Sequence, residues 1–168
     1  TTNNTPTNYS VDLAEGTHTW SVECQDDSNN TNVSVENLVR VDTINPSVLL
    51  TAPATGSSQI NGDVTLTYTV TDENLENCTV YGDFTGTYRD NETNSTPNAG
   101  TINGWHVVTV ANSNNTYTWN VECRDTFGNV ISNETNYTFS VDSISPVVTP
   151  SFPANGANVT NGTINFTF

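Results

Sequence analysis

Short runs in which apolar and polar residues alternate recur along the whole chain, and one of these runs occurs twice. In the stretch YTWNVECRD at residues 117–125, tyrosine, tryptophan, valine and cysteine alternate with polar residues. A period of two places the apolar side chains on one face of a β-strand. The stretch HTWSVECQD at residues 18–26 repeats this pattern, with Trp20 and Trp119 99 positions apart. Two copies of one core strand at this separation predict a tandem array of β-domains.

The segments between these strands recur as well, with a period of about a hundred residues. The sequence DTINP at 42–46 matches DSISP at 142–146, and VTLTY at 64–68 matches INFTF at 164–168. Strands separated by turn residues indicate an antiparallel β-sandwich. The alternation predicts strands at 48–51, 64–71, 78–84, 105–111, 116–124 and 137–142, a short edge strand at 85–88, and an exposed polar insertion at 89–104. The inward-facing residues are predicted to be Val64, Leu66, Tyr68, Val70, Cys78, Val80, Val108, Val110, Tyr117, Trp119, Val121, Tyr137, Phe139 and Val141.

The repeat divides the chain into three parts. Residues 46–145 form one complete copy, residues 1–45 correspond to the last three strands of a preceding copy (9–13, 17–25 and 33–41), and residues 146–168 correspond to the first two strands of a following copy. An apolar half-strand with an open edge promotes aggregation. We therefore expect the sequence to be a window on a longer protein. The alternative is strand donation between neighbouring subunits, which leaves the counterpart of the Cys78 strand missing.

Composition excludes several classes of partner. The net charge is −15, with no lysine and three arginines, so the chain would repel nucleic acid and anionic lipid. Hydrophobic residues make up only 33 % of the chain, but they lie in alternating runs rather than in the aromatic-poor composition of disorder. No stretch approaches the roughly 18 apolar residues of a membrane span, so we expect no membrane insertion in this segment.

The three cysteines fit the repeat. Cys78 begins the third predicted strand of the complete copy and Cys123 ends a later one, so antiparallel neighbours would bring them together in a disulfide. Cys24 occupies the position of Cys123, and its partner is expected outside the chain; the alternative is a free reactive thiol. A disulfide implies an oxidising, extracellular setting. No CxxC or HxxH spacing suggests zinc.

Asn-x-Ser/Thr sequons are dense, and most fall in predicted loops or at strand ends where a glycan would be exposed. Chance in a chain rich in Asn and Thr explains many of them. We nevertheless expect several to carry glycans in a glycosylating organism. The candidates are Asn3, Asn8, Asn29, Asn32, Asn77, Asn91, Asn94, Asn114, Asn133, Asn136, Asn158, Asn161 and Asn165.

Carboxylates gather near the predicted joints between copies. Asp42 and Asp142 each end the last strand of a copy, and Asp72 follows the second strand of the complete one. Oxygen ligands of this kind suit calcium, so these three residues are candidate calcium ligands, against the alternative of solvated or turn-capping aspartates. No other cofactor is expected. The chain has no GxSxG, HExxH, P-loop or GxGxxG motif, and we expect no enzymatic activity.

These motifs resemble a known family. The joint of the form VD(T/S)xxP at 41–46 and 141–146 resembles the boundary in tandem bacterial and archaeal immunoglobulin-like repeats of surface proteins. The stretch from 117 to 129 is similar to archaeal surface versions with Asn/Thr-rich loops. The resemblance implies tandem immunoglobulin-like antiparallel β-sandwiches in an adhesin, stalk or filament subunit, with calcium at the joints of some relatives. The tryptophan on the strand of the second cysteine departs from the antibody pattern.

The expected function is therefore structural or adhesive: a segment of a glycosylated stalk or filament on the cell surface. Its expected partners are copies of itself or neighbouring immunoglobulin-like domains, and cell-surface glycans or proteins. The alternatives are a carbohydrate-binding accessory module of a secreted hydrolase and a segment of a viral fibre. An exposed aromatic platform would favour the module. Burial of both Trp20 and Trp119 would favour the stalk.

Overall fold

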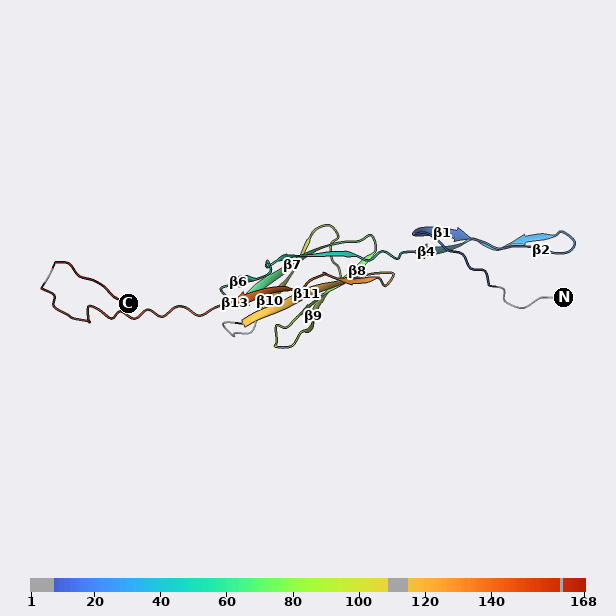
Figure 1. Cartoon of the computed structure of the whole chain (residues 1–168). Coiled ribbons are helices and arrows are strands. Elements are labelled where there is room, and N and C mark those ends of the chain that lie inside the picture. Colours follow the sequence, from blue (N-terminus) through green and yellow to red (C-terminus); the bar gives the residue numbers. More distant parts are fainter. Residues whose placement is uncertain (1–7, 109–114, 161) are drawn as a thin grey trace.

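The computed structural model describes residues 8–108, 115–160 and 162–168, and this part of the chain is all-β, with no helix. Its strands lie along an extended molecule (Figure 1). The bounds are β1 Gly16–Trp20, β2 Glu23–Gln25, β3 Thr31–Val33, β4 Asn37–Val41, β5 Ser47–Ala52, β6 Ser57–Gln59, β7 Asp63–Thr71, β8 Leu75–Gly82, β9 Arg89–Asn94, β10 Ile102–Val108, β11 Asn115–Asp125, β12 Val130–Ser132 and β13 Tyr137–Val141.

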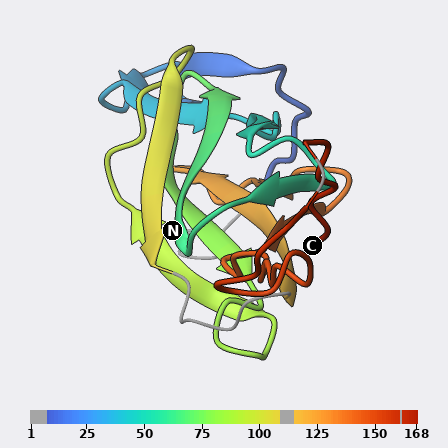
Figure 2. The ribbon, with the colours of Figure 1, turned by 90° about the vertical axis from the view of Figure 1, so that its left-hand side faces the viewer.

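The central segment, residues 46–145, contains two of the sheets. One sheet has the order β10-β7-β5, and the other has the order β6-β13-β11-β8-β9 with β12 paired to β11. Every pairing is antiparallel except that of β13 with β6, which is parallel. The end-on view of Figure 2 shows these strands arranged around a common interior. One cluster of buried apolar residues draws on both sheets, because each strand turns its alternate apolar residues to the same side.

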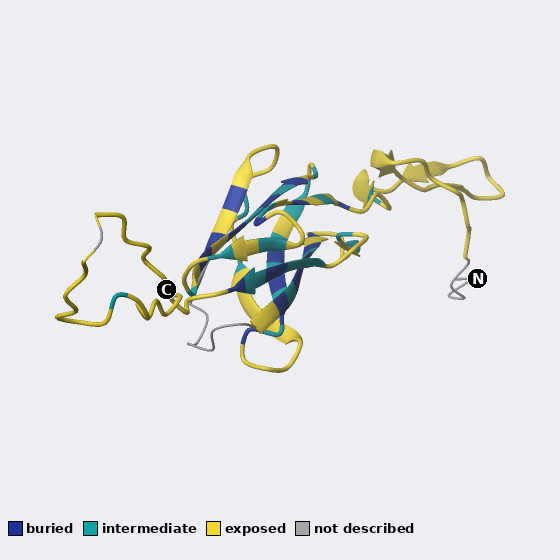
Figure 3. Ribbon diagram, turned by 60° about the vertical axis from the view of Figure 1, so that its left-hand side comes forward, coloured by how far each residue is buried: buried dark blue, intermediate teal, exposed yellow. Residues whose placement is uncertain are grey.

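The core follows the predicted alternation closely. All the predicted inward residues whose burial is described are buried, except Tyr137, which is partly buried, while Val108 and Val110 lie outside the side chains described. Leu50, Phe84 and Trp105 complete the core without having been predicted. Figure 3 shows that burial is concentrated in the central segment and that both flanking segments are largely exposed.

The predicted edge strand at 85–88 is absent, and residues 89–104, predicted to be an exposed polar insertion, are mostly exposed but contain β9 and the start of β10. Residues 84–87 form turns and bends, with Gly86 at a φ of 94°, and the edge strand is β9 at Arg89–Asn94. β9 has no apolar residue, so its sequence carries no alternating signal. Its backbone pairs with β8 while five of its six side chains are exposed, which allows a wholly polar edge strand.

The N-terminal segment, residues 8–45, contains two short hairpins. The predicted strand at 9–13 is absent, and the predicted strands at 17–25 and 33–41 are each divided in two. Nevertheless, the pairs keep the register of the central segment. Trp20 pairs with Asn37 as Trp119 pairs with Tyr137, and Cys24 pairs with Asn32 as Cys123 pairs with Ile131.

The C-terminal segment, residues 146–168, has one isolated bridge between Phe152 and Thr167 where two strands are predicted. Its local contacts copy those of the central segment 100 positions earlier. The hydroxyls of Ser151 and Thr167 lie 2.8 Å apart, as those of Thr51 and Thr67 lie 2.7 Å apart. The turn in which Ala157 N–H donates to the Ala154 carbonyl likewise repeats the turn closed by Ser57 and Ala54.

Candidate functional site

The loop that follows β11 is organised by a buried carboxylate. Oδ1 of Asp125 accepts hydrogen bonds from the backbone N–H of Phe127 (2.8 Å) and Asn129 (2.9 Å), and Oδ2 accepts from Nδ2 of Asn129 (2.7 Å). Gly128 takes a φ of 95°, which favours glycine. Burial raises the pKa of Asp125, but hydrogen bonds from Asn129, Phe127 and Gly128 outweigh it and hold the pKa below its ordinary value of 3.8. Asp125 is therefore an ionised, fully satisfied buried group.

The same loop follows β2 in the N-terminal segment. Oδ1 of Asp26 accepts from the N–H of Ser28 and of Asn30, both at 2.9 Å, and Oδ2 accepts from Nδ2 of Asn30 at 2.8 Å. Asn29 takes the left-handed conformation, with a φ of 65°, at the position of Gly128. An Asp-x-x-x-Asn sequence thus builds one loop geometry twice.

The loop after β11 also holds the joint that precedes β5. Nδ2 of Asn129 donates to the backbone carbonyl of Asp42 at 3.1 Å, and Nδ2 of Asn74 donates to Oδ2 of Asp42 at 2.7 Å. Asn74 is itself fixed, because its N–H donates to Oδ1 of Asp72 (2.7 Å) and its carbonyl accepts from the N–H of Thr126 (2.8 Å). Two asparagines of the central segment therefore bind Asp42, the residue that follows the last strand of the N-terminal segment.

A side chain of the N-terminal segment also binds the joint. The N–H of Thr43 donates to both carboxylate oxygens of Glu15, each at 3.1 Å, and the Thr43 hydroxyl also contacts Oε1 of Glu15. Pro46, which follows, is buried. A groove of about 810 Å³ lies at the joint, lined by residues of both segments, including Glu15, Arg40, Asp72 and Phe127.

Negative charge is concentrated at this groove. The pKa of Asp72 is raised, first by desolvation and then by the charges of Asp125, Asp42 and Glu73. Two of the candidate calcium ligands, Asp42 and Asp72, are thus neighbours. Asp142 follows β13, whose last residue pairs with the first residue of β11, so β11 separates it from Asp125 by about 30 Å. Among the described residues, no group of three or more His, Cys, Asp or Glu side chains is arranged to hold a metal ion.

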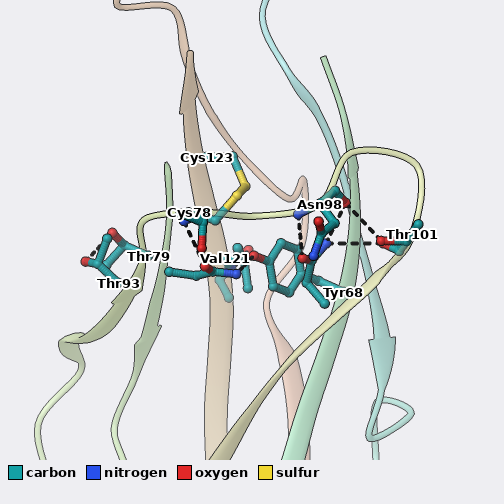
Figure 4. The surroundings of a disulfide bond; sticks show 12 residues. Tyr68, Cys78, Thr79, Thr93, Asn98, Thr101, Val121 and Cys123 are labelled. Atoms are coloured by element: carbon teal, nitrogen blue, oxygen red, sulfur yellow. Dashed lines mark hydrogen bonds between the residues drawn. A yellow bond between two sulfur atoms is a disulfide. The ribbon is translucent and has the colours of Figure 1, made fainter. Parts of the chain in front are cut away.

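Cys78 and Cys123 form a disulfide, with their Cα atoms 4.1 Å apart. The bond links β8 to β11, where the two residues are direct register partners, and both are fully buried. In Figure 4 Tyr68, Asn98 and Thr101 lie on one side of the disulfide, with Thr101 drawn farthest from it. Cys24 is exposed and unpaired.

The described sequons differ in their surroundings. Asn8, Asn29, Asn32, Asn91, Asn136, Asn158 and Asn165 are exposed, whereas Asn77, Asn94 and Asn133 are partly buried. Nδ2 of Asn91 donates to the carbonyls of Gly82 and Arg89, so exposure of a residue does not by itself leave the acceptor nitrogen free. Asn3, Asn114 and Asn161 lie outside the described residues.

Sequence reasoning missed the two asparagines that build the joint. Asn129 has a recognisable signal, because it ends an Asp-x-x-x-Asn spacing that recurs at Asp26 and Asn30. Asn74 has a weaker one, its place two residues after Asp72 in a turn. Neither signal indicates that the amides point at Asp42, which is more than thirty residues away from Asn74 in the chain.

Comparisons with known proteins place the chain in no family. No family model matches it, and no curated protein matches it. Among solved structures it is similar to the crystal structure of an engineered protein, with 20 % identity and a TM-score of 0.40 over 57 % of this chain. The match covers 20 % of that protein's chain. The part of the chain that the structure describes contains no helix that could span a membrane.

Proposed function

We propose that this chain is part of an extracellular string of immunoglobulin-like β-sandwich domains whose work is mechanical: a structural or adhesive segment of a stalk or filament. The central segment would be one complete domain. Residues 8–45 would belong to the domain before it and residues 146–168 to the domain after it. Catalysis is not expected, and the partners would be neighbouring domains of the same kind, with cell-surface glycans or proteins as adhesion targets.

The observation that carries the proposal is the repetition of local geometry at a spacing of about one hundred residues. The Asp26 loop and the Asp125 loop share three equivalent hydrogen bonds, and the strand registers around them are the same. Ser151 and Thr167 repeat the contact of Thr51 and Thr67 on the other side. Such repetition supports copies of one unit arranged in series.

The hydrogen bonds at the joint support a role in holding neighbouring domains at a set distance. A linker without tertiary contacts would act as a flexible tether. Here Asn74, Asn129 and Glu15 bind the linker through side chains from both sides. The extended arrangement in Figure 1 is what a series of domains held by such joints would produce. The disulfide between Cys78 and Cys123 supports an oxidising, extracellular location.

One observation favours the alternative of a carbohydrate-binding module. Tyr81 and Tyr88 stack with ring centroids 6.5 Å apart, and Tyr88 is 44 % exposed. Trp119 is fully buried, which favours the stalk, but Trp20 is 52 % exposed. Binding to immobilised polysaccharides that disappears in a Tyr88→Ala variant would select the module. Electron microscopy of the native material that shows a fibre would select the stalk.

The joint can be tested by double electron–electron resonance. One spin label is attached to Cys24, which is exposed, and a second to Thr85→Cys in the exposed turn after β8. The double variant N74A/N129A removes both amide donors to Asp42, so the distance distribution between the labels should broaden. The exposed Asn155→Ala serves as the matched control and should leave the distribution narrow. An unchanged width in N74A/N129A would mean that the amides do not hold the joint.

A further inference from the structure

One edge of the N-terminal segment has no strand partner within the described residues. β1 pairs with β4 and β2 pairs with β3, and each pair is an isolated two-stranded sheet. β11, which covers the equivalent residues 115–125, has a further neighbour, β8, which pairs with it from Trp119 to Asp125. The edge of residues 16–26 that corresponds to the β8 side of β11 therefore presents unpaired backbone groups, which are a template for another strand.

The same residues expose an apolar face that is buried in the central segment. Trp20 is 52 % exposed and Val22 is 50 % exposed, whereas Trp119 and Val121 are each 0 % exposed. Cys24 is exposed as a free thiol, whereas Cys123 is bonded to Cys78 of β8. The unpaired edge, the exposed apolar face and the free thiol therefore lie on the same short stretch. In the central segment, β8 pairs with the equivalent edge, bonds to the equivalent cysteine and covers part of the equivalent face.

We propose that residues 16–26 are a docking edge for a cysteine-bearing β-strand of the β8 type, which forms a disulfide with Cys24. The register of β8 on β11 defines the occupant. A cysteine lies opposite Cys24, a valine two residues later lies opposite Val22, and a glycine four residues later lies opposite Trp20. This inference rests on the proposed function, because it takes residues 16–26 as a copy of β11.

The register restricts which strands fit. Successive side chains of a strand point to opposite faces, so a slip by one residue would turn the cysteine away from Cys24. The β8 strand of a folded second molecule is not available, because it already pairs with β11 on one side and β9 on the other. The occupant is therefore a strand without partners of its own.

The covalent step is a thiol–disulfide exchange. The thiolate of Cys24 attacks the strand's cysteine sulfur, which carries a small thiol in a mixed disulfide. The bond between Cys24 and the strand forms while the bond to the small thiol breaks, and the small thiol leaves as a thiolate. The proton of Cys24 passes to solvent, and no further oxidant is needed.

The test uses the 168-residue chain and a synthetic peptide of residues 75–84 (LENCTVYGDF), whose cysteine is activated as a mixed disulfide with 2-thiopyridine. The control peptide exchanges the cysteine with the following threonine (LENTCVYGDF), so composition and chemistry are unchanged. Adducts are followed by intact mass, with the Cys24→Ser chain as the control for reaction at other sulfurs. The fluorescence of Trp20 is obtained by difference from a Trp20→Phe chain.

Strand docking raises the local concentration of the two sulfurs, so the matched peptide should form its adduct at least about tenfold faster than the control peptide. The emission of Trp20 should shift to shorter wavelength as the docked strand covers one side of the ring. Equal rates for the two peptides, or an adduct that leaves Trp20 emission unchanged, would overturn the inference and leave Cys24 as an accessible thiol. The joint experiment uses neither peptide, so its outcome tests the proposed function separately.

Discussion

Replacing Asp125 with alanine should destabilise the central segment severely. The Asp125 carboxylate is fully buried and accepts hydrogen bonds from two backbone N–H groups and one amide. Alanine supplies no acceptor, so all three donors would lose their partner. Asn129 would also lose the contact that aims its amide at Asp42. The substitution should therefore weaken both the fold and the joint.

The expected loss follows from the number of orphaned donors. An unsatisfied buried donor costs about 1–3 kcal/mol. The three effects are not additive, because the exposed residues 126–128 allow water to reach part of the loop. Removal of one partner from a buried charged network typically costs about 3–5 kcal/mol. We expect a decrease of about 3–5 kcal/mol in the free energy of unfolding of Asp125→Ala at neutral pH.

Urea denaturation followed by tryptophan fluorescence measures this change, because Trp105 and Trp119 are buried and become exposed on unfolding. Since the folded state lowers the pKa of Asp125, its stabilisation is complete above the ordinary value of 3.8 and is lost as the pH falls through the lowered pKa. The difference between the wild-type chain and Asp125→Ala should accordingly be constant from pH 5 to pH 7 (about one unit and more above that value) and shrink in stronger acid.

Asp26→Ala is the matched control. It removes an equivalent set of three hydrogen bonds from an exposed loop and should leave the unfolding of the central segment unchanged. A loss below about 1 kcal/mol for Asp125→Ala, or an equal loss for Asp26→Ala, would refute the reasoning that burial makes this carboxylate important.

Two other changes test the joint and the disulfide. Asp72→Asn should stabilise the chain at pH 7 by up to about 1 kcal/mol, because the raised pKa of Asp72 means that the folded state disfavours its charge. This gain should shrink as the pH falls through the raised pKa of the folded state and should be absent below 3.8, where the carboxyl is protonated in both states; a loss of stability at pH 7 would contradict it. Reduction of the Cys78–Cys123 disulfide, which closes a separation of 45 residues, should lower the free energy of unfolding by about 4 kcal/mol in urea titrations with and without reductant. A Cys24→Ser chain should respond to reductant as the wild type does.

The alternation of side chains allowed much of the fold to be predicted. Strands with a clear period of two, such as β7 and β11, were located within a few residues, and their inward faces were assigned correctly. The pairing of Cys78 with Cys123 followed from the same reasoning, since both lie on inward faces of neighbouring strands. These features are local, because the period of a strand is written in consecutive residues.

Other features depend on residues far apart in the chain and were not predicted. β9 is polar throughout and is a strand only because β8 supplies its backbone partners. The burial of Asp125 and the hydrogen bond from Asn74 to Asp42 likewise arise from contacts between separate elements. The type of a polar residue does not show whether it will bind water or a backbone group that is far away in the sequence.

The two tryptophan strands separate what the sequence alone determined from what tertiary structure decided. The pattern around Trp20 and Trp119 is nearly identical, and it specified the same hairpin register in both places. Yet one ring is half exposed and the other is fully buried. Alternation determines which face of a strand is apolar, but burial requires a second layer and a neighbouring strand, and only the packing of β5, β7 and β8 supplies these for Trp119.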